Sequence, residues 1–196
     1  GNLTFKTTPM GIILTPEKLV LIASEDVNII DVVINNYGKK FESIRSFVMM
    51  ILLATTKRYL KYLKTLNINI IRAEAKLRKT QSNQELINLM EIEKSLVYFT
   101  TSLKGNQMVM ERILSGRLTE NEEEKEFIRD VIIENNQALE MSQLYNNIVD
   151  SLTNAFSSII SNNLNIVMKA LAALTIILNF PMLVSSVYGM NVPLPF

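Results

Sequence analysis

Side-chain amides and hydroxyls recur in the C-terminal part of the chain, in a stretch that carries no charge after Lys169. At helical spacing they share one face, and Gly189-Met190-Asn191 follows at the far end. This face carries Asn165, Met168, Ala172, Thr175 or Ile176, Asn179, Leu183 and Ser186. Uncharged oxygens are costly in a membrane unless they meet partners or water, so Asn179 indicates either a hydrogen bond between helices or a pore lining. A ring of Asn carbonyl oxygens can hold a hydrated Mg²⁺ through its waters.

The composition excludes several other chemistries. The 196 residues include no Cys and no His, so disulfides, thiolate or imidazole ligands and Ser-His-Asp triads are ruled out in this chain, and a metal must meet oxygen ligands. The net charge of +1 lacks the basic field on which nucleic-acid binding depends. No nucleophile–base pair or phosphate-binding glycine loop occurs, so the sequence favours neither an enzyme nor a nucleic-acid partner.

An uncharged segment extends from Ala170 to Phe196. Its part from 170 to 187 is long enough to cross a bilayer core of about 30 Å as a helix, which predicts a transmembrane helix. A buried helix of a soluble protein stays open as the alternative. Lys169 flanks the segment on its N-terminal side and no charge follows, so the positive-inside rule places residues 1 to about 168 in the cytoplasm.

Two long helices are predicted to position this segment. From Phe41, a stripe recurring every three or four residues predicts one amphipathic helix: Ile44, Val48, Ile51, Thr55, Tyr59, Tyr62, Leu66, Ile70, Ala73 and Leu77. After a turn at Thr80-Gln81-Ser82-Asn83, a second stripe returns to Gly116 and completes an antiparallel hairpin. This second stripe comprises Leu86, Leu89, Leu96, Val97, Leu103, Met110 and Ile113.

A third helix is predicted to start at a capping box, with Thr119 as N-cap and Glu122 at N3. Its stripe is Phe127, Val131, Glu134, Ala138, Met141, Tyr145, Ile148, Leu152, Ala155, Ile159, Asn162 and Ile166. No Gly or Pro interrupts it before Pro181, so one helix is expected to continue into the membrane. A helix of that length must pack against copies of itself or other helices. Asn162 is interpreted either as a buried residue that fixes the oligomeric state or as a solvated Asn.

The first forty residues predict a small α/β part. Gly11–Thr15 and Leu19–Ala23 are rich in β-formers and flank Pro16-Glu17-Lys18, which predicts a β-hairpin, and one short helix is expected between 26 and 37. Two strands are too few for an independent fold, so we expect the chain to begin inside a truncated α/β domain.

Residues from about 126 to 195 resemble the stalk-to-pore sequence of the CorA family of divalent-cation transporters. The resemblance rests on Ser161 to Lys169 (SNNLNIVMK), on Leu171, Thr175 and Pro181, and on Tyr188-Gly189-Met190-Asn191. Gly-Met-Asn alone is a weak motif, whereas the combination is specific. The helical hairpin is similar to the family in layout and length. The resemblance implies a homopentamer whose pore is lined by the third helix.

The patterns and the resemblance together predict a fold that is mainly α with a small β part. The expected parts are a partial N-terminal α/β cytoplasmic domain (1–40), a helical hairpin (41–118), a stalk helix (119–168), the first transmembrane or pore helix (169–188) and the start of the outer loop (189–196). The resemblance also implies a second membrane helix after this loop, and we expect about a third of the family's usual N-terminal domain to be missing from this chain.

The resemblance also implies roles for individual residues. Asn191 corresponds to the selectivity ring at the outer mouth, where Gly189 and Met190 turn the loop. Asn165, Met168 and Leu171 correspond to an inner polar ring and a hydrophobic constriction. The pore-lining set is Asn165, Met168, Leu171, Thr175 and Asn179.

Phe127-Ile128-Arg129-Asp130 resembles the family segment whose Asp binds regulatory Mg²⁺ between neighbouring subunits, a role that carries onto Asp130. The acidic partner of that site belongs to a part of the α/β domain that this chain lacks. A solvated helix carboxylate is therefore the alternative for Asp130. The acidic run from Glu122 to Glu126 is interpreted as a solvated face, with loose binding of divalent cations as the alternative.

The implied function is passive, potential-driven transport of hydrated Mg²⁺, with Co²⁺ and Ni²⁺ as further candidate ions, through a homopentameric pore gated by cytoplasmic Mg²⁺. The expected location is the inner or plasma membrane of the cell, and the expected partners are copies of the chain, the lipid bilayer and divalent cations. Two alternatives stay open. One is a membrane-anchored helical scaffold or sensor, and the other is a Zn²⁺ transporter of the same fold.

Overall fold

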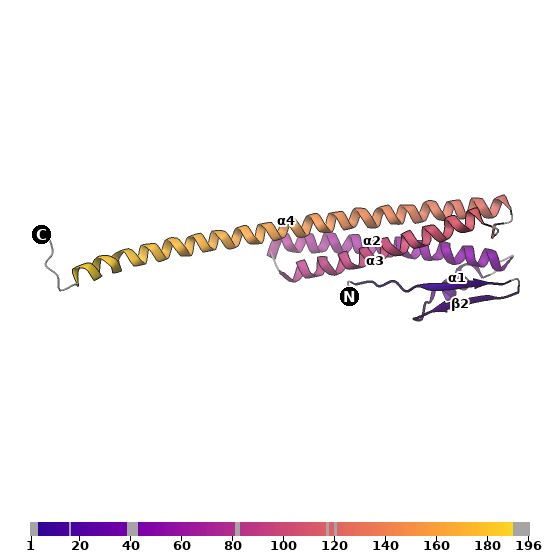
Figure 1. The fold of residues 1–196 in the computed structure, drawn as a ribbon, viewed down its shortest axis with the longest axis horizontal. Helices are drawn as coiled ribbons and strands as arrows, with labels where there is room; N and C mark the ends of the chain where they lie inside the picture. The colour runs from indigo at the N-terminus through magenta and orange to yellow at the C-terminus, as the bar shows by residue number, and fades with distance from the viewer. Residues whose placement is uncertain are drawn as a thin grey trace. The chain divides into compact units, whose positions relative to one another are not determined.

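The computed structural model describes residues 4–15, 17–38, 43–80, 83–116, 118–119 and 121–189. In chain order the elements are β1 (Met10–Leu14), β2 (Leu19–Ala23), α1 (Ile29–Tyr37), α2 (Ile44–Thr80), α3 (Asn83–Ser115) and α4 (Glu122–Tyr188) (Figure 1). The chain divides into two compact units, Gly1–Thr153 and Asn154–Phe196, and α4 contributes to both. The predicted fold class, mainly α with a small β part, is confirmed.

The two strands form an antiparallel hairpin in which Met10 pairs with Ala23 and Leu14 with Leu19. The first strand starts and ends one residue earlier than predicted, because Thr15 closes the turn instead of extending the strand. The main-chain N–H and the Oγ1 hydroxyl of Thr15 both donate to the carbonyl oxygen of Lys18, each over 2.9 Å. The hairpin and α1 cover the start of α2 through a cluster around Ile29, Val33, Ile51 and Ala54.

Helices α2 and α3 pack as the predicted hairpin. Both expected stripes are largely buried, with Leu66, Leu77, Leu89 and Leu96 wholly excluded from solvent. Val97 was wrongly assigned to the stripe of α3, since it is 49% exposed while its neighbour Leu96 occupies the core. Residues 81 and 82 of the predicted turn lie outside the described residues.

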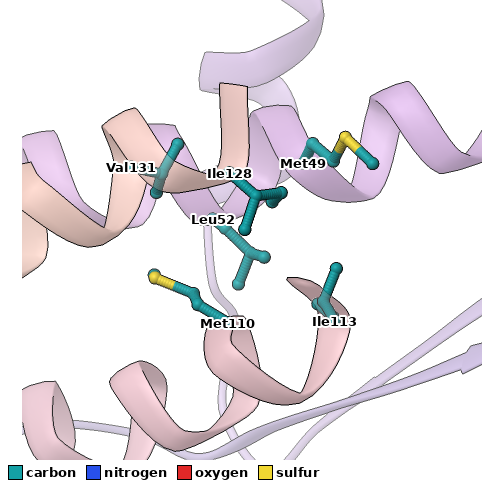
Figure 2. Close-up of a cluster of buried hydrophobic side chains, with 6 residues drawn as sticks. All are labelled: Met49, Leu52, Met110, Ile113, Ile128 and Val131. Atoms are coloured by element: carbon teal, nitrogen blue, oxygen red, sulfur yellow. The ribbon is translucent and has the colours of Figure 1, made fainter. Parts of the chain in front are cut away.

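Helix α4 closes a three-helix core with α2 and α3. Figure 2 shows six buried side chains meeting there: Met49 and Leu52 of α2, Met110 and Ile113 of α3, and Ile128 and Val131 of α4. The start of α4 differs from the prediction. The Asn121 Oδ1 accepts the main-chain N–H of Glu124 over 2.8 Å, so Asn121 is the N-cap and the Thr119 hydroxyl is buried without a partner among the described residues.

The buried stripe of α4 was only half predicted. Val131 and Ala138 are buried as expected, but three further predicted positions, Glu134, Met141 and Ile148, each lie one residue before a buried position. The buried residues there are Asn135, Ser142 and Val149. Two of these are polar, and both bond to main-chain carbonyls of α3, which is why a search for apolar residues missed them.

Candidate ion-binding and pore-lining residues

The C-terminal part of α4 is an exposed apolar helix. From Ser161 to Gly189 every described residue is exposed, and an 18-residue window has a mean hydropathy of 2.0 with none of it buried. Within the described part of the chain, α4 is therefore a helix long and apolar enough to cross a membrane. None of the described residues covers that window, so the described part of the chain does not bury this helix in its own core.

Four of the five predicted pore-lining residues fall on one side of the helix. At about 100° per residue, Asn165, Met168, Thr175 and Asn179 lie within a sector of about 80°. Leu171 lies roughly 40° beyond the edge of that sector, so it borders the polar stripe rather than continuing it. All five predicted pore-lining residues are exposed on α4.

The side-chain amides and the hydroxyl of this stripe differ in whether they have hydrogen-bond partners. The Thr175 Oγ1 donates to the carbonyl oxygen of Leu171 over 2.8 Å, which leaves its lone pairs available. Neither Asn165 nor Asn179 makes a side-chain hydrogen bond to any residue that the structure describes. Pro181 lies inside the helix and lacks an N–H, so the carbonyl of Ile177 has no helical donor from that position. The segment thus offers amide and carbonyl oxygens in apolar surroundings.

The predicted selectivity segment lies at the end of α4. The Gly189 N–H donates to the carbonyl oxygen of Ser185 over 3.0 Å and closes the last helical turn. A Cβ added at Gly189 would lie 3.2 Å from that same oxygen, so the position fits a residue without a side chain. Met190 and Asn191 lie outside the described residues.

Asp130, the predicted regulatory ligand, is exposed near the start of α4. The described residues contain no group of three or more Asp or Glu side chains placed to hold a metal ion. Of the nearby acids, Glu122 is engaged by Lys125, whose Nζ lies 2.6 Å from its Oε1, and this hydrogen bond, followed by the Lys125 charge, lowers the pKa of Glu122. Asp130 therefore belongs to no described group of three carboxylates, and its regulatory role stays a prediction.

Two polar residues of α4 were missed by the sequence analysis. Asn135 and Ser142 are fully buried against α3. The signal that would have found them is their seven-residue spacing with Ile128 and Val149, which are also buried.

The comparisons with known proteins place these features in a family. Residues 3–196 match the family model described as "CorA-like Mg2+ transporter protein". The chain is 27% identical over 192 residues to a cobalt/magnesium transport protein CorA of Methanocaldococcus jannaschii, covering 94% of this chain and 61% of that protein. It thus spans about three fifths of the length of this curated relative.

Solved structures agree in fold. The complete structure of the CorA magnesium transporter from the same organism has a TM-score of 0.77 at 23% identity and matches 96% of this chain and 66% of its own. The soluble domain of that CorA has a TM-score of 0.68 at 23% identity, over 74% of this chain and 61% of its own. With the family model matching from residue 3 to the end, this chain belongs to the CorA-like Mg²⁺ transporter protein family.

Proposed function

We propose that this chain forms part of a homopentameric channel through which hydrated Mg²⁺, and also Co²⁺ or Ni²⁺, crosses the cell membrane. Proteins of its family are transporters located in membranes. The observation that carries the proposal is the exposed polar stripe of α4, in which Asn165, Thr175 and Asn179 share one side of an apolar, unburied helix. An isolated helix in lipid would leave these groups without partners, whereas a ring of copies turns them toward water.

The ion would pass with its water still bound. Mg²⁺ loses its hydration shell reluctantly, and neutral amide oxygens can accept hydrogen bonds from its waters without a fixed charge. No catalytic step is needed, because an inside-negative potential favours entry of a divalent ion by roughly 4.6 kcal/mol per 100 mV, twice the value for one charge. Asn191, with Gly189 and Met190, is the proposed outer filter, and Met168 with Leu171 the proposed constriction.

The proposal includes an orientation and a regulatory step. Residues 1 to about 168 lie in the cytoplasm, and the helix from 169 to 188 crosses the bilayer. Cytoplasmic Mg²⁺ bound at Asp130 between subunits favours the closed state by binding it more tightly than the open one. In the full-length protein, Asp130→Ala should weaken the inhibition of flux by internal Mg²⁺. Inhibition equal to that of the wild type would remove Asp130 from the mechanism.

The experiment that tests transport is divalent-ion flux into liposomes containing the full-length protein under an inside-negative potential. Asn165→Ala and Asn191→Ala should lower Mg²⁺ flux or its selectivity. Asn163→Ala is the matched control, because Asn163 lies about 160° from Asn165 around the helix. No flux of any divalent ion by the wild type would contradict the proposal and favour an anchored scaffold. Zn²⁺ flux in place of Mg²⁺ flux would favour a zinc transporter.

A further inference from the structure

Two polar side chains occupy the buried face of α4 where it lies against α3. Asn135 and Ser142 are both fully excluded from solvent. They belong to a seven-residue series that runs from Ile128 through Val149 to Phe156, and all of its members are buried. In helix pairs this spacing marks the seam between the helices, a place that apolar residues usually fill. Polar side chains at two successive seam positions therefore require a physical reason.

Both side chains bond to the backbone of α3. The Asn135 Nδ2 donates to the carbonyl oxygen of Leu103 over 3.0 Å, and the Ser142 Oγ donates to the carbonyl oxygen of Leu96 over 3.1 Å. The step is seven residues on each helix, from 135 to 142 on α4 and from 103 back to 96 on α3. Main-chain carbonyls occupy fixed positions along a helix, so a slide of two residues, about 3 Å, would stretch both bonds beyond hydrogen-bond range at once.

A third contact makes the position of Ser142 more specific. The Thr100 Oγ1 lies 2.9 Å from the Ser142 Oγ. Because the Ser142 hydroxyl gives its proton to Leu96, Thr100 must be the donor to Ser142. Ser142 therefore both donates and accepts inside the α3–α4 interface.

Stability alone does not account for Asn135. Its Oδ1 is buried and has no hydrogen-bond partner among the described residues. Leaving such an acceptor unpaired costs about 1–3 kcal/mol, so an apolar side chain of similar size would stabilise the seam more. Buried Asn residues in coiled coils have this same property, since they select one register at some cost in stability.

We propose that Asn135 and Ser142 are positioning residues that hold α4 in one axial register on α3. The two helices then move as one body, and α4 does not slide along α3. If the chain transports ions as proposed above, any displacement of α4 during gating must carry α3 with it.

The test measures the register directly by spin-label distances in the full-length protein in lipid nanodiscs. Labels are placed at Lys104→Cys of α3 and Asn147→Cys of α4, both exposed positions, after any Cys outside these Cys-free 196 residues has been replaced by Ser. Labelled subunits are diluted with unlabelled ones so that distances within one chain dominate. A slide changes the distance by about 1.5 Å per residue.

In the wild type we expect one narrow distance that is the same in Mg²⁺ and in EDTA. Asn135→Leu combined with Ser142→Ala should broaden the distribution in steps of about 1.5 Å, without a matching loss of helix content. Ser151→Ala is the control, because the Ser151 hydroxyl bonds only the Asn147 carbonyl of its own helix.

A wild-type distance that shifts between Mg²⁺ and EDTA would overturn the proposal, as would a double variant whose distribution stays as narrow as that of the wild type. The comparison of the wild-type distances in Mg²⁺ and in EDTA tests the proposal even if the double variant fails to assemble. The result is also separable from transport: absent Mg²⁺ flux would refute the proposed function, while the distances would still report the register.

Discussion

Ser142 of α4 donates a hydrogen bond over 3.1 Å to the main-chain carbonyl oxygen of Leu96 of α3, in an interface from which solvent is excluded. Ser142→Ala removes this bond and also the acceptor used by Thr100. We expect a loss of about 1 kcal/mol in local stability, since both changes affect buried groups. Hydrogen exchange of the α3 and α4 amides measures it. Ser151→Ala, which removes an exposed hydroxyl, should change local stability by less than about 0.5 kcal/mol.

The core where three helices meet gives a second prediction. Met110 is fully buried in the cluster of Figure 2, whereas Met108, two residues earlier on α3, is 72% exposed. Met110→Ala leaves a cavity between α2, α3 and α4 and should destabilise the protein by about 2–5 kcal/mol. Met108→Ala should have little effect. Denaturation of the two variants side by side measures the difference, and equal losses would show that this cluster does not hold the helices together.

Much of the fold was predictable because the helices carry strong apolar periodicity. The stripes of α2 and α3 and the hairpin between them follow from side chains such as Leu66 and Leu89, whose burial drives the packing. The seam of α4 was less predictable. Its buried positions include Asn135 and Ser142, and their burial depends on carbonyls of a helix far away in the sequence. Likewise, the sequence pattern favoured Thr119 as N-cap, whereas the hydrogen bond to the main-chain N–H of Glu124 is accepted by Asn121.

The candidate site likewise has features that the sequence predicts and features that it does not. The apolar part of α4 and its polar stripe follow from composition and spacing, and the structure places Asn165 and Asn179 on one side of the helix. The roles of these residues depend on neighbouring copies, and an ion site shared between subunits cannot be read from the periodicity of one chain. Asp130 illustrates this limit, because one carboxylate on an exposed helix surface does not define a metal site.

The third prediction concerns pH. Glu93 of α3 lies beside Asp150 of α4, and burial, followed by the nearby Asp150 carboxylate, raises the pKa of Glu93. The folded state therefore holds this proton more tightly than the unfolded state, whose Glu pKa is about 4.3. The resulting stabilisation is complete below that value and is lost as pH rises through the raised pKa of the folded state.

Glu93→Gln should remove this dependence, because the amide stays neutral at every pH. The variant should melt at a higher temperature than the wild type at pH 8, and the two should approach one another near pH 4. Glu140→Gln, at an exposed position of α4, serves as the control. Its melting temperature should change between pH 4 and pH 8 by as much as that of the wild type. A Glu93→Gln protein less stable than the wild type at pH 8 would show that the Glu93 carboxylate is favourable in the fold.

The last prediction separates the two roles open to Asn179. Its amide is exposed on α4 and bonds to none of the described residues, so it either faces a pore or bonds to a neighbouring helix in the assembly. If it faces the pore, Asn179→Ala should lower Mg²⁺ flux. A lost interaction of about 1.4 kcal/mol in the rate-limiting step corresponds to a decrease of about tenfold. The resistance of the oligomer to detergent should stay unchanged. If it bonds between helices, the oligomer should instead dissociate more readily.

Phe180→Ala changes the adjacent, 70% exposed residue and should affect neither selectivity nor the relative flux of divalent ions. We expect the first outcome, because Asn179 shares its side of the helix with Asn165 and Thr175, and three polar groups along one side favour a continuous wetted path over a single bond between helices.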